Sequence, residues 1–537
     1  MSILSGAAGS VQPHRFYDAT EAGLSELLDT INGYVWSNAL VYLCLAAGVY
    51  FSVRSRFVQV RQFPEMIRLM LKGEKSPSGV SSFQALTMSL AGRVGTGNIA
   101  GVATAIAFGG PGALFWMWAV AFLGASTSFV ECTLGQIYKT RDRLTGEYRG
   151  GPAYYLSRAL AHTRAAGLFK VYGFIFAAVT ILAMGLLLPS VQSNSMASAM
   201  NSAWGFNKWW VAVGTVIVLA FVIIGGVKRI AAFASIVVPF MAVVYIVLAL
   251  VVVFVNVGAV PEVLRMIFES AFGVDSAFGA ILGSAVMWGV KRGIYSNEAG
   301  QGSGPHAAAA AEVSHPAKQG LVQAFAVYVD TLFICSATGF LILSTGAYRV
   351  FEGESESGAV IADGGLLATD AEVGPAFAQT AFDTLWSGAG SSFIAISLAF
   401  FCFTTLIAYY YMAETNLRFV LGKSAPVAVP FIRGTVGSNA TMLLQALILV
   451  SVVIGAVSTA TDAWVLGDIG VGLMAWLNIV GIIILQQPAY KALWDYEKQK
   501  KAGLDPVFDP VALDITGAKF WESYDPTTGK DRQTATV

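Results

Sequence analysis

The stretch Ala91-Gly-Arg-Val-Gly-Thr-Gly-Asn-Ile-Ala-Gly101 lies within an apolar run and is poorly suited to a continuous helix. It holds four glycines in eleven residues, and each costs a helix about 1 kcal/mol relative to alanine. Broken backbone at membrane depth is tolerated only where it is buried in protein or lines a cavity. Unwinding frees amides that can hold a carboxylate and carbonyls that can bind a cation such as sodium. Because Thr96 and Asn98 add polar side chains, we interpret this stretch as a binding site rather than as close packing through small residues.

The composition around this stretch predicts an all-α integral membrane protein. Of the 537 residues, 55% are hydrophobic and 12% are charged, about half the charged fraction usual in a soluble domain. The apolar residues come in runs of about 20, the length of helix that crosses a bilayer core. The net charge is zero, which gives no reason to expect a nucleic-acid partner.

About eleven membrane spans are predicted, one extra helix followed by two halves of five. The extra helix covers 32–53; it follows an amphipathic extracellular segment at 1–31 and precedes a cytoplasmic connector at 54–78. The halves cover 79–257 and 258–487, and 488–537 forms a polar tail. Spans two and seven, at about 81–109 and 276–304, are the glycine-broken helices and open the two halves. Because five is odd, the halves have inverted topology, and interrupted helices in equivalent positions mark the binding site of a transporter.

Basic residues indicate the orientation of these spans in the membrane. With the amino terminus outside, the inward-facing loops and span ends hold all 33 Lys and Arg except Arg15, Arg93, Lys208, Arg265 and Arg349. We therefore expect an extracellular amino terminus and a cytoplasmic carboxy terminus, in a multi-pass protein of the plasma (inner) membrane.

The second broken stretch, Trp288-Gly-Val-Lys-Arg-Gly-Ile-Tyr-Ser-Asn-Glu-Ala-Gly-Gln-Gly-Ser-Gly304, holds five glycines and several charged residues. A loop between two spans would explain Gly300 to Gly304. It would not explain Gly289, because the apolar run before that glycine is too short to cross the membrane. We therefore expect a helix break at Gly289, within the membrane.

Two further spans carry polar side chains that fit a binding site. In Gln192-Ser-Asn-Ser195, the amides of Gln192 and Asn194 either bind a substrate or bridge helices, because unpaired polar groups in a span are costly. Thr404 and Thr405 offer hydroxyl oxygens of the kind that sodium prefers, although threonine also bonds to its own helix. Tyr409 lies four residues after Thr405 and shares its helix face.

Buried charges form a separate group, because a span tolerates them only when they are paired. They are Arg93, Glu131, Asp330, Glu414 and Asp468. We expect Arg93 to pair with an acidic neighbour, and Arg93, Glu131 and Asp330 are our candidates for an inner gate. A permanent structural ion pair is the alternative.

Together these stretches resemble the alanine or glycine:cation symporter family, also called sodium:alanine symporters. The resemblance extends from the first span to the eleventh and rests on Gly95-Thr-Gly-Asn-Ile-Ala-Gly-Val-Ala103, Gly109-Gly-Pro-Gly-Ala-Leu-Phe-Trp-Met-Trp118, Lys291-Arg-Gly-Ile-Tyr-Ser-Asn-Glu-Ala-Gly300 and Gln319-Gly-Leu-Val-Gln323, leading into Asp330. It implies the five-plus-five, LeuT-like inverted-repeat fold of the amino acid–polyamine–organocation superfamily, preceded by one extra helix.

The resemblance also implies which residues form the site. The amino acid would contact Thr96, Gly97, Gln192, Thr405 and Tyr409, to which their position in the spans adds Asn98 and Asn194. The wider fold implies a sodium site between carbonyls near Ala91 and Val94 and the hydroxyls of Thr404 and Thr405. The chain departs from the family at Ala408-Tyr409, where Gly-Trp is usual, and at Ser193, where Ala is common.

We therefore predict sodium-coupled symport of a small neutral amino acid, alanine or glycine, into the cell by alternating access. Sodium is the coupling ion and no other cofactor is expected. Proton coupling through Asp330 or Glu131 is the alternative, and a channel is a more distant one, because the polar groups converge on one midplane site. An enzyme is disfavoured, because the sequence shows no Cys/His cluster, nucleophile–base pair or phosphate-binding loop.

Overall fold

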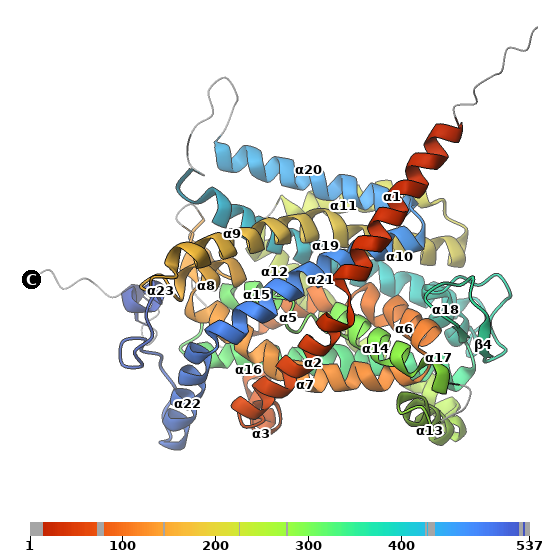
Figure 1. Ribbon diagram of the computed structural model, residues 1–537, viewed down its shortest axis with the longest axis horizontal. Coiled ribbons are helices and arrows are strands. Elements are labelled where there is room, and N and C mark those ends of the chain that lie inside the picture. The colour runs from red at the N-terminus through yellow and green to blue at the C-terminus, as the bar shows by residue number, and fades with distance from the viewer. Residues whose placement is uncertain are drawn as a thin grey trace, which may run out of the picture.

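The computed structural model describes residues 14–71, 80–142, 145–224, 226–274, 278–424, 427, 435–525 and 530–531, most of them in helices packed side by side (Figure 1). Within this part of the chain, eight helices are long and apolar enough to cross a membrane: Ser25–Arg54, Gly112–Ile137, Ala166–Trp204, Ile230–Val255, Pro316–Thr345, Ala389–Leu421, Val436–Val457 and Ala460–Leu485. Two shorter apolar stretches are Gly97–Gly109 and Lys208–Ile223. The chain is therefore the helical membrane protein that its composition predicts.

The chain begins with α1 (His14–Val35) and α2 (Asn38–Arg54), and Figure 1 shows α1 continuing the line of α2 beyond the bundle. The helix that starts in the predicted amphipathic segment thus runs on past residue 31, to Val35. The Trp476 indole donates to the Val35 carbonyl over 3.0 Å and joins α1 to α21 (Ala460–Leu485). The connector begins with α3 (Val58–Arg61) and α4 (Phe63–Leu71), and its predicted remainder, 72–78, lies outside the described residues.

The first glycine-rich stretch is broken, as its sequence predicts. Helix α5 (Ser82–Arg93) starts at a capping box between Ser81 and Gln84 and ends where Val94 turns to extended backbone. The π-helix η1 (Gly97–Gly101) follows and leads into α6 (Val102–Gly109). Single π-helical turns are rare and are frequent at functional sites.

The second glycine-rich stretch breaks at a different place from the one predicted. Helix α14 (Leu282–Asn297) runs unbroken through Gly289. A Cβ at Gly289 would lie 2.5 Å from the Trp116 Cβ, so this glycine lets α7 (Gly112–Ile137) approach closely. The break comes instead at Glu298, Gly300 and Gly302, all with positive φ, before α15 (Gly304–Ala310).

The remaining helices complete the bundle. They are α8 (Pro152–Arg158), α9 (Ala166–Leu182), η2 (Ala183–Leu187), α10 (Leu188–Trp204), α11 (Lys208–Ile223), α12 (Gly226–Val255), η3 (Val257–Ala259), α13 (Val260–Ala271), η4 (Gly279–Ile281), α16 (Pro316–Tyr328), η5 (Val329–Cys335), α17 (Ser336–Thr345), α18 (Pro375–Asp383), α19 (Ala389–Leu421), η6 (Gly422–Ser424), α20 (Val436–Val457), α22 (Gln487–Lys501) and α23 (Lys519–Ser523). In the described residues, the strands form three antiparallel pairs: β1 (Thr140–Arg141) with β2 (Tyr148–Arg149), β3 (Arg349–Phe351) with β4 (Val360–Asp363), and β5 (Tyr524–Asp525) with β6 (Lys530–Asp531).

The core of the bundle surrounds the two broken helices. Helix α7 is buried along nearly its whole length, and α19 is buried from Thr404 to Asn416. The outer helices expose large apolar side chains instead, among them Ile217, Ile236 and Leu443. Exposed apolar residues on the outside and buried polar residues within are the pattern of a helical bundle in lipid.

Candidate functional site

Backbone oxygens at the end of α5 meet hydroxyl oxygens of α19. The Thr405 hydroxyl lies 2.8 Å from the Ala91 carbonyl oxygen and 3.3 Å from that of Val94. The hydroxyls of Thr404 and Thr405 both lie 2.9 Å from the Phe401 carbonyl oxygen. Because α5 ends at Arg93, carbonyls in its last turn point beyond the helix. Three of the four predicted sodium ligands, Ala91, Val94 and Thr405, thus lie in one buried group of oxygens that also includes Phe401, while the Thr404 hydroxyl bonds back to its own helix.

A second group surrounds the amide of Thr96. The side-chain oxygen of Gln192, on α10, accepts from the Thr96 amide over 3.1 Å. The side-chain nitrogen of Gln192 donates to the Tyr409 hydroxyl over 3.4 Å. The Thr96 hydroxyl lies 3.1 Å from the Cys402 sulfur, a neighbour that the sequence did not point to. A Cβ at Gly95 would lie 2.6 Å from the Thr405 hydroxyl and 2.8 Å from the Gln192 oxygen. Glycine at this position is therefore what lets the two groups touch.

A third group gathers around the buried Asp330 carboxylate of η5. Asn98 donates to it over 2.6 Å, the Ser296 hydroxyl over 2.9 Å and the Thr331 hydroxyl over 2.8 Å. These donors are neutral, and within the described residues Asp330 makes no ion pair. A Cβ at Gly97 would lie 3.1 Å from the Ser296 Cα, so η1 and α14 pack tightly here. Asp330, predicted as a gate residue, thus shares a cluster with Asn98.

Asn194 lies apart from these groups. Its amide nitrogen donates to the carbonyls of Gly455 and Ser458 over 3.0 and 2.8 Å. It bridges α10 to the end of α20, which is the alternative that the sequence left open for this residue.

The two other gate candidates do not pair with each other. Arg93 donates to the Gln323 carbonyl over 3.1 Å and to the Ser128 hydroxyl over 3.3 Å. It forms no ion pair with an acid among the described residues, so the expected pairing is absent from this state. The Glu131 carboxylate instead accepts from the amides of Gly300 and Gly302 over 3.2 and 3.1 Å. Asn478 of α21 adds a third donor at 2.7 Å.

A charged cluster between α14 and α21 was not predicted as part of the site. Asp468 accepts from Lys291 and from Arg292, each over 2.7 Å. The Arg292 guanidinium lies 4.1 Å from the centre of the Trp464 ring. Trp464 also lines a cavity of about 440 Å³ that carries polar side chains such as Lys208. The sequence marked these charges individually, but it could not show that residues so far apart meet.

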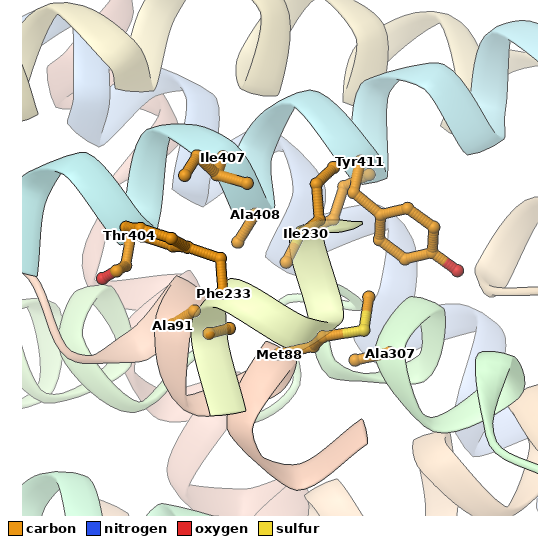
Figure 2. A pocket seen from close by; sticks show the side chains of 11 residues that line it. Met88, Ala91, Ile230, Phe233, Ala307, Thr404, Ile407, Ala408 and Tyr411 are labelled. Carbon is orange, nitrogen blue, oxygen red and sulfur yellow. The ribbon is translucent and has the colours of Figure 1, made fainter. Parts of the chain in front are cut away.

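A small apolar hollow adjoins the group of oxygens around Thr405. It has a volume of about 10 Å³ and touches Ala91 and Thr404, so it has room for about one water molecule. Figure 2 shows its walls, with Met88 of α5, Phe233 of α12 and Tyr411 of α19 among them.

Comparison with known proteins agrees with the resemblance seen in the motifs. Residues 21–510 match the model of the sodium:alanine symporter family. The chain is 49% identical to the sodium/proton-dependent alanine carrier protein of Bacillus sp. (strain PS3), over 85% of this chain and 97% of that protein. It is 36% identical to the sodium/alanine symporter AgcS of Methanococcus maripaludis, over 86% and 94%. A solved structure of a Na+-coupled sialic acid symporter is also similar, with 13% identity, a TM-score of 0.47 and coverage of 94% and 99%.

Proposed function

We propose, because the chain belongs to the sodium:alanine symporter family, that it uses the sodium gradient to carry a small neutral amino acid, alanine or glycine, into the cell. As a member of this family the chain is a transporter and not an enzyme. The observation that carries the proposal is the group of oxygens where α5 ends. Two backbone carbonyls and the Thr405 hydroxyl of α19 converge there in the buried interior, and the Thr404 hydroxyl belongs to the neighbouring residue of the same helix.

In the proposed membrane arrangement, the chain crosses the plasma membrane eleven times, with its amino terminus outside. After the first helix, residues 79–257 and 258–487 form two inverted, LeuT-like halves. Each half opens with one of the broken spans, α5–α6 and α14–α15. In favour of this arrangement, the eight long apolar helices, α11 and the two broken spans together make eleven.

We assign the sodium ion to the carbonyls of Ala91 and Val94 and the hydroxyls of Thr404 and Thr405. In the structure the Thr405 hydroxyl lies within hydrogen-bond distance of both carbonyls and of the Phe401 carbonyl of its own helix. An arriving cation would lie between the hydroxyl and the carbonyls of Ala91 and Val94, and the hydroxyl would turn its oxygen toward the ion. Oxygen ligands of this kind replace the hydration shell of a hard cation.

We assign the amino acid to the groups around Thr96, Gly97 and Asn98. The free end of the π-helix η1 offers the Thr96 amide, on which the Gln192 oxygen now rests. A substrate carboxylate would displace that oxygen, and the freed Gln192 and Tyr409 would then face the substrate amine. The close approach of Gly97 to Ser296 favours a substrate with a small side chain, because η1 and α14 pack tightly there. We assign Asn194 to helix bridging rather than to the substrate.

The driving force suits accumulation of a neutral substrate. One sodium ion crossing a potential of about 100 mV releases about 2.3 kcal/mol, and a tenfold sodium gradient adds about 1.4 kcal/mol. Together these hold a neutral amino acid at roughly a few hundredfold accumulation.

Uptake of labelled alanine into proteoliposomes tests the proposal. We expect uptake to rise when an inward sodium gradient is imposed, and to stay at background with lithium or potassium. An unchanged rate with sodium would overturn the coupling to this ion.

Proton coupling is the second candidate, and the Asp330 cluster favours it. A buried carboxylate that meets only neutral donors is costly, so it calls for a proton or a cation. An inward proton gradient without sodium would then drive uptake, and Asp330→Asn would abolish that response. Uptake that ignores the proton gradient would remove this candidate.

Arg93 and Glu131 remain our proposed inner gate residues. The Glu131 carboxylate holds the amides of the second break and would have to release them for that end to open. Arg93, whose partners among the described residues are neutral, would then be free to pair with it. An Arg93→Ala variant that transports at the normal rate would exclude this role.

A further inference from the structure

The chain after α22 folds back over one end of the bundle. We call residues 505–524 the docked tail; they include α23 and the first residue of β5. Figure 1 shows α22 and α23 at the end of the bundle where α8 also lies. In the proposed orientation this is the cytoplasmic end. Beside its bonds to α22 and α16, the tail has three attachments that bear on opening of this end.

The first attachment is to the segment that joins α15 to α16. The Phe508 amide donates to the Ser314 carbonyl over 3.0 Å, and the Ser314 hydroxyl donates back to the Pro506 carbonyl over 2.8 Å. The Phe508 ring is fully buried and lies 5.3 Å from the His315 ring. This segment directly follows the inner half of the second broken span.

The second attachment is to the end of α7. The fully buried Trp521 indole donates to the Gln136 carbonyl over 2.9 Å. The Lys139 Nζ lies 4.7 to 5.1 Å from the ring centres of Tyr148, Phe520 and Trp521. The same nitrogen donates to the Ala311 carbonyl over 2.8 Å. Aromatic residues of the tail thus close over the place where α7 meets the end of α15.

The third attachment is to α8 and the turn after it. The Thr516 hydroxyl lies 2.8 Å from the His162 Nδ1. Gly517 has a φ of +81°, and a Cβ there would lie 2.5 Å from the Arg158 carbonyl oxygen. The backbone of the tail is therefore in direct contact with the backbone at the end of α8. Helix α8 in turn packs on α9, and Gly173 of α9 has no room for a Cβ beside the Ala153 carbonyl.

These attachments join parts of the molecule that transport would separate. The segment after α15 also bonds to Val80, just before α5, through the Ala310 carbonyl and the Glu312 amide. It therefore connects the inner halves of both broken spans. In the proposed alternating access, the path from the site to the cytoplasm would open between these inner halves and the α8–α9 side. The docked tail is bonded to both sides of that path.

We propose that the docked tail is a clamp that keeps the cytoplasmic side of the carrier closed and limits the rate at which it opens. The inference rests on the proposed function, because only a carrier that alternates between its two sides needs such an opening. Release of the tail would let the inner side open, and this opening would expose the inner half of α7, including Cys132, which is buried beside Gly304. Permanent packing of the tail, without movement, is the alternative.

The rate at which Cys132 reacts with a thiol reagent measures this opening, and the measurement needs no substrate. Cys132 is fully buried, and its sulfur would lie 3.2 Å from a Cβ at Gly304. We would label full-length protein in proteoliposomes with a membrane-permeant maleimide and follow each cysteine by peptide mass spectrometry. In Trp521→Ala, we expect Cys132 to react at least about fivefold faster than in the unmodified protein.

Two controls accompany this measurement. Glu522→Ala changes an exposed residue of the same helix and should leave the rate unchanged. Cys44 of α2 lies outside the proposed path, and its rate should not change in either variant. An unchanged Cys132 rate in Trp521→Ala, or an equal rise at Cys44 that indicates general loosening, would overturn the clamp.

A reversible tether tests the same idea through transport. Thr516→Cys combined with His162→Cys, bridged by a short dithiol-reactive linker that a reductant cleaves, would fix the tail to α8. We expect alanine uptake to fall at least about tenfold on bridging and to recover on cleavage. The same linker should leave uptake by each single-cysteine variant unchanged. Normal uptake by fully bridged protein would overturn the clamp. Absence of sodium-stimulated uptake by the unmodified protein would instead defeat the proposed function, and the Cys132 measurement would still decide the clamp.

Discussion

The two glycine-broken spans hold different kinds of partner. At the first break, the carbonyls of Ala91 and Val94 and the amide of Thr96 meet neutral side chains, which a cation and a carboxylate can replace. At the second break, the amides of Gly300 and Gly302 hold the buried Glu131 carboxylate. Separating the carboxylate from these amides would leave a buried charge without its hydrogen bonds, at a cost of about 1–3 kcal/mol or more. The first break is therefore suited to exchanging partners, and the second to holding one partner until the inner side opens.

The largest expected effect comes from Thr405→Val, which removes a hydroxyl at the first break and keeps the shape of the side chain. The lost oxygen lies between two carbonyls, and a hydrogen bond or ligand to a charged group contributes about 1.5–3 kcal/mol. We expect the sodium concentration for half-maximal alanine uptake to rise about 10- to 100-fold. Thr405→Ser keeps the oxygen and should stay close to the unmodified protein. A valine variant with normal sodium dependence would show that the first break does not bind the ion.

Gly95→Ala tests whether the two groups at the first break must touch. The added Cβ would lie 2.6 Å from the Thr405 hydroxyl and 2.8 Å from the Gln192 oxygen, so it must push the ion and substrate groups apart. We expect alanine uptake to fall about tenfold, because overpacking a tight site costs about 1–3 kcal/mol. Gly214→Ala on α11 is the matched control, since a Cβ there meets nothing within 4 Å. Equal uptake by the two variants would contradict the assignment of the site.

Local sequence predicted the first break better than the second, for a physical reason. Around Gly95, glycines occur together with Thr96 and Asn98, and polar side chains show that the freed backbone has partners to bind. Gly289 also has polar neighbours, but Lys291 and Arg292 pair with Asp468 and not with freed backbone. A glycine in a span also serves close helix packing, as Gly289 does here against Trp116. The oxygen group around Thr405 could be expected from helix spacing and the family resemblance together.

Contacts between distant parts of the chain could not be predicted in this way. The Asn194 amide has two carbonyls of α20 as partners, and no local pattern distinguishes such a bridge from a substrate contact. The ion pairs of Asp468 with Lys291 and Arg292 join two helices whose packing only the fold determines. The same holds for Glu131, whose partners lie in a loop that the sequence marked only as glycine-rich.

Glu131→Gln tests the second break, and a smaller effect is expected. A glutamine amide has one acceptor oxygen, so one of the amides of Gly300 and Gly302 would face an NH2 group and lose its partner. An unsatisfied buried donor costs about 1–3 kcal/mol, so we expect the unfolding temperature in detergent to fall by a few degrees. The sodium dependence of uptake should stay unchanged. Glu262→Gln, at an exposed residue of α13, is the control. A loss of sodium affinity without a loss of stability would reverse the roles assigned to the two breaks.

The smallest effect concerns how the far end of the second broken span is held. Lys139, beyond the end of α7, donates to the Ala311 carbonyl after α15. Burial lowers the pKa of Lys139 from 10.5 to about 7, although Glu312 opposes the shift. Docking of the tail therefore favours the neutral form of the Lys139 amine. When the tail is released, the same amine stays protonated up to about its usual pKa. Between these two pKa values the uncovered state binds more protons, so docking strengthens as the pH rises above about 7. We expect trypsin to cleave after Lys519 a few-fold more slowly at pH 8.5 than at pH 7, relative to a free peptide of the same sequence. Lys139→Met, which cannot titrate, should remove this difference, and a difference that persists in that variant would place the pH response elsewhere.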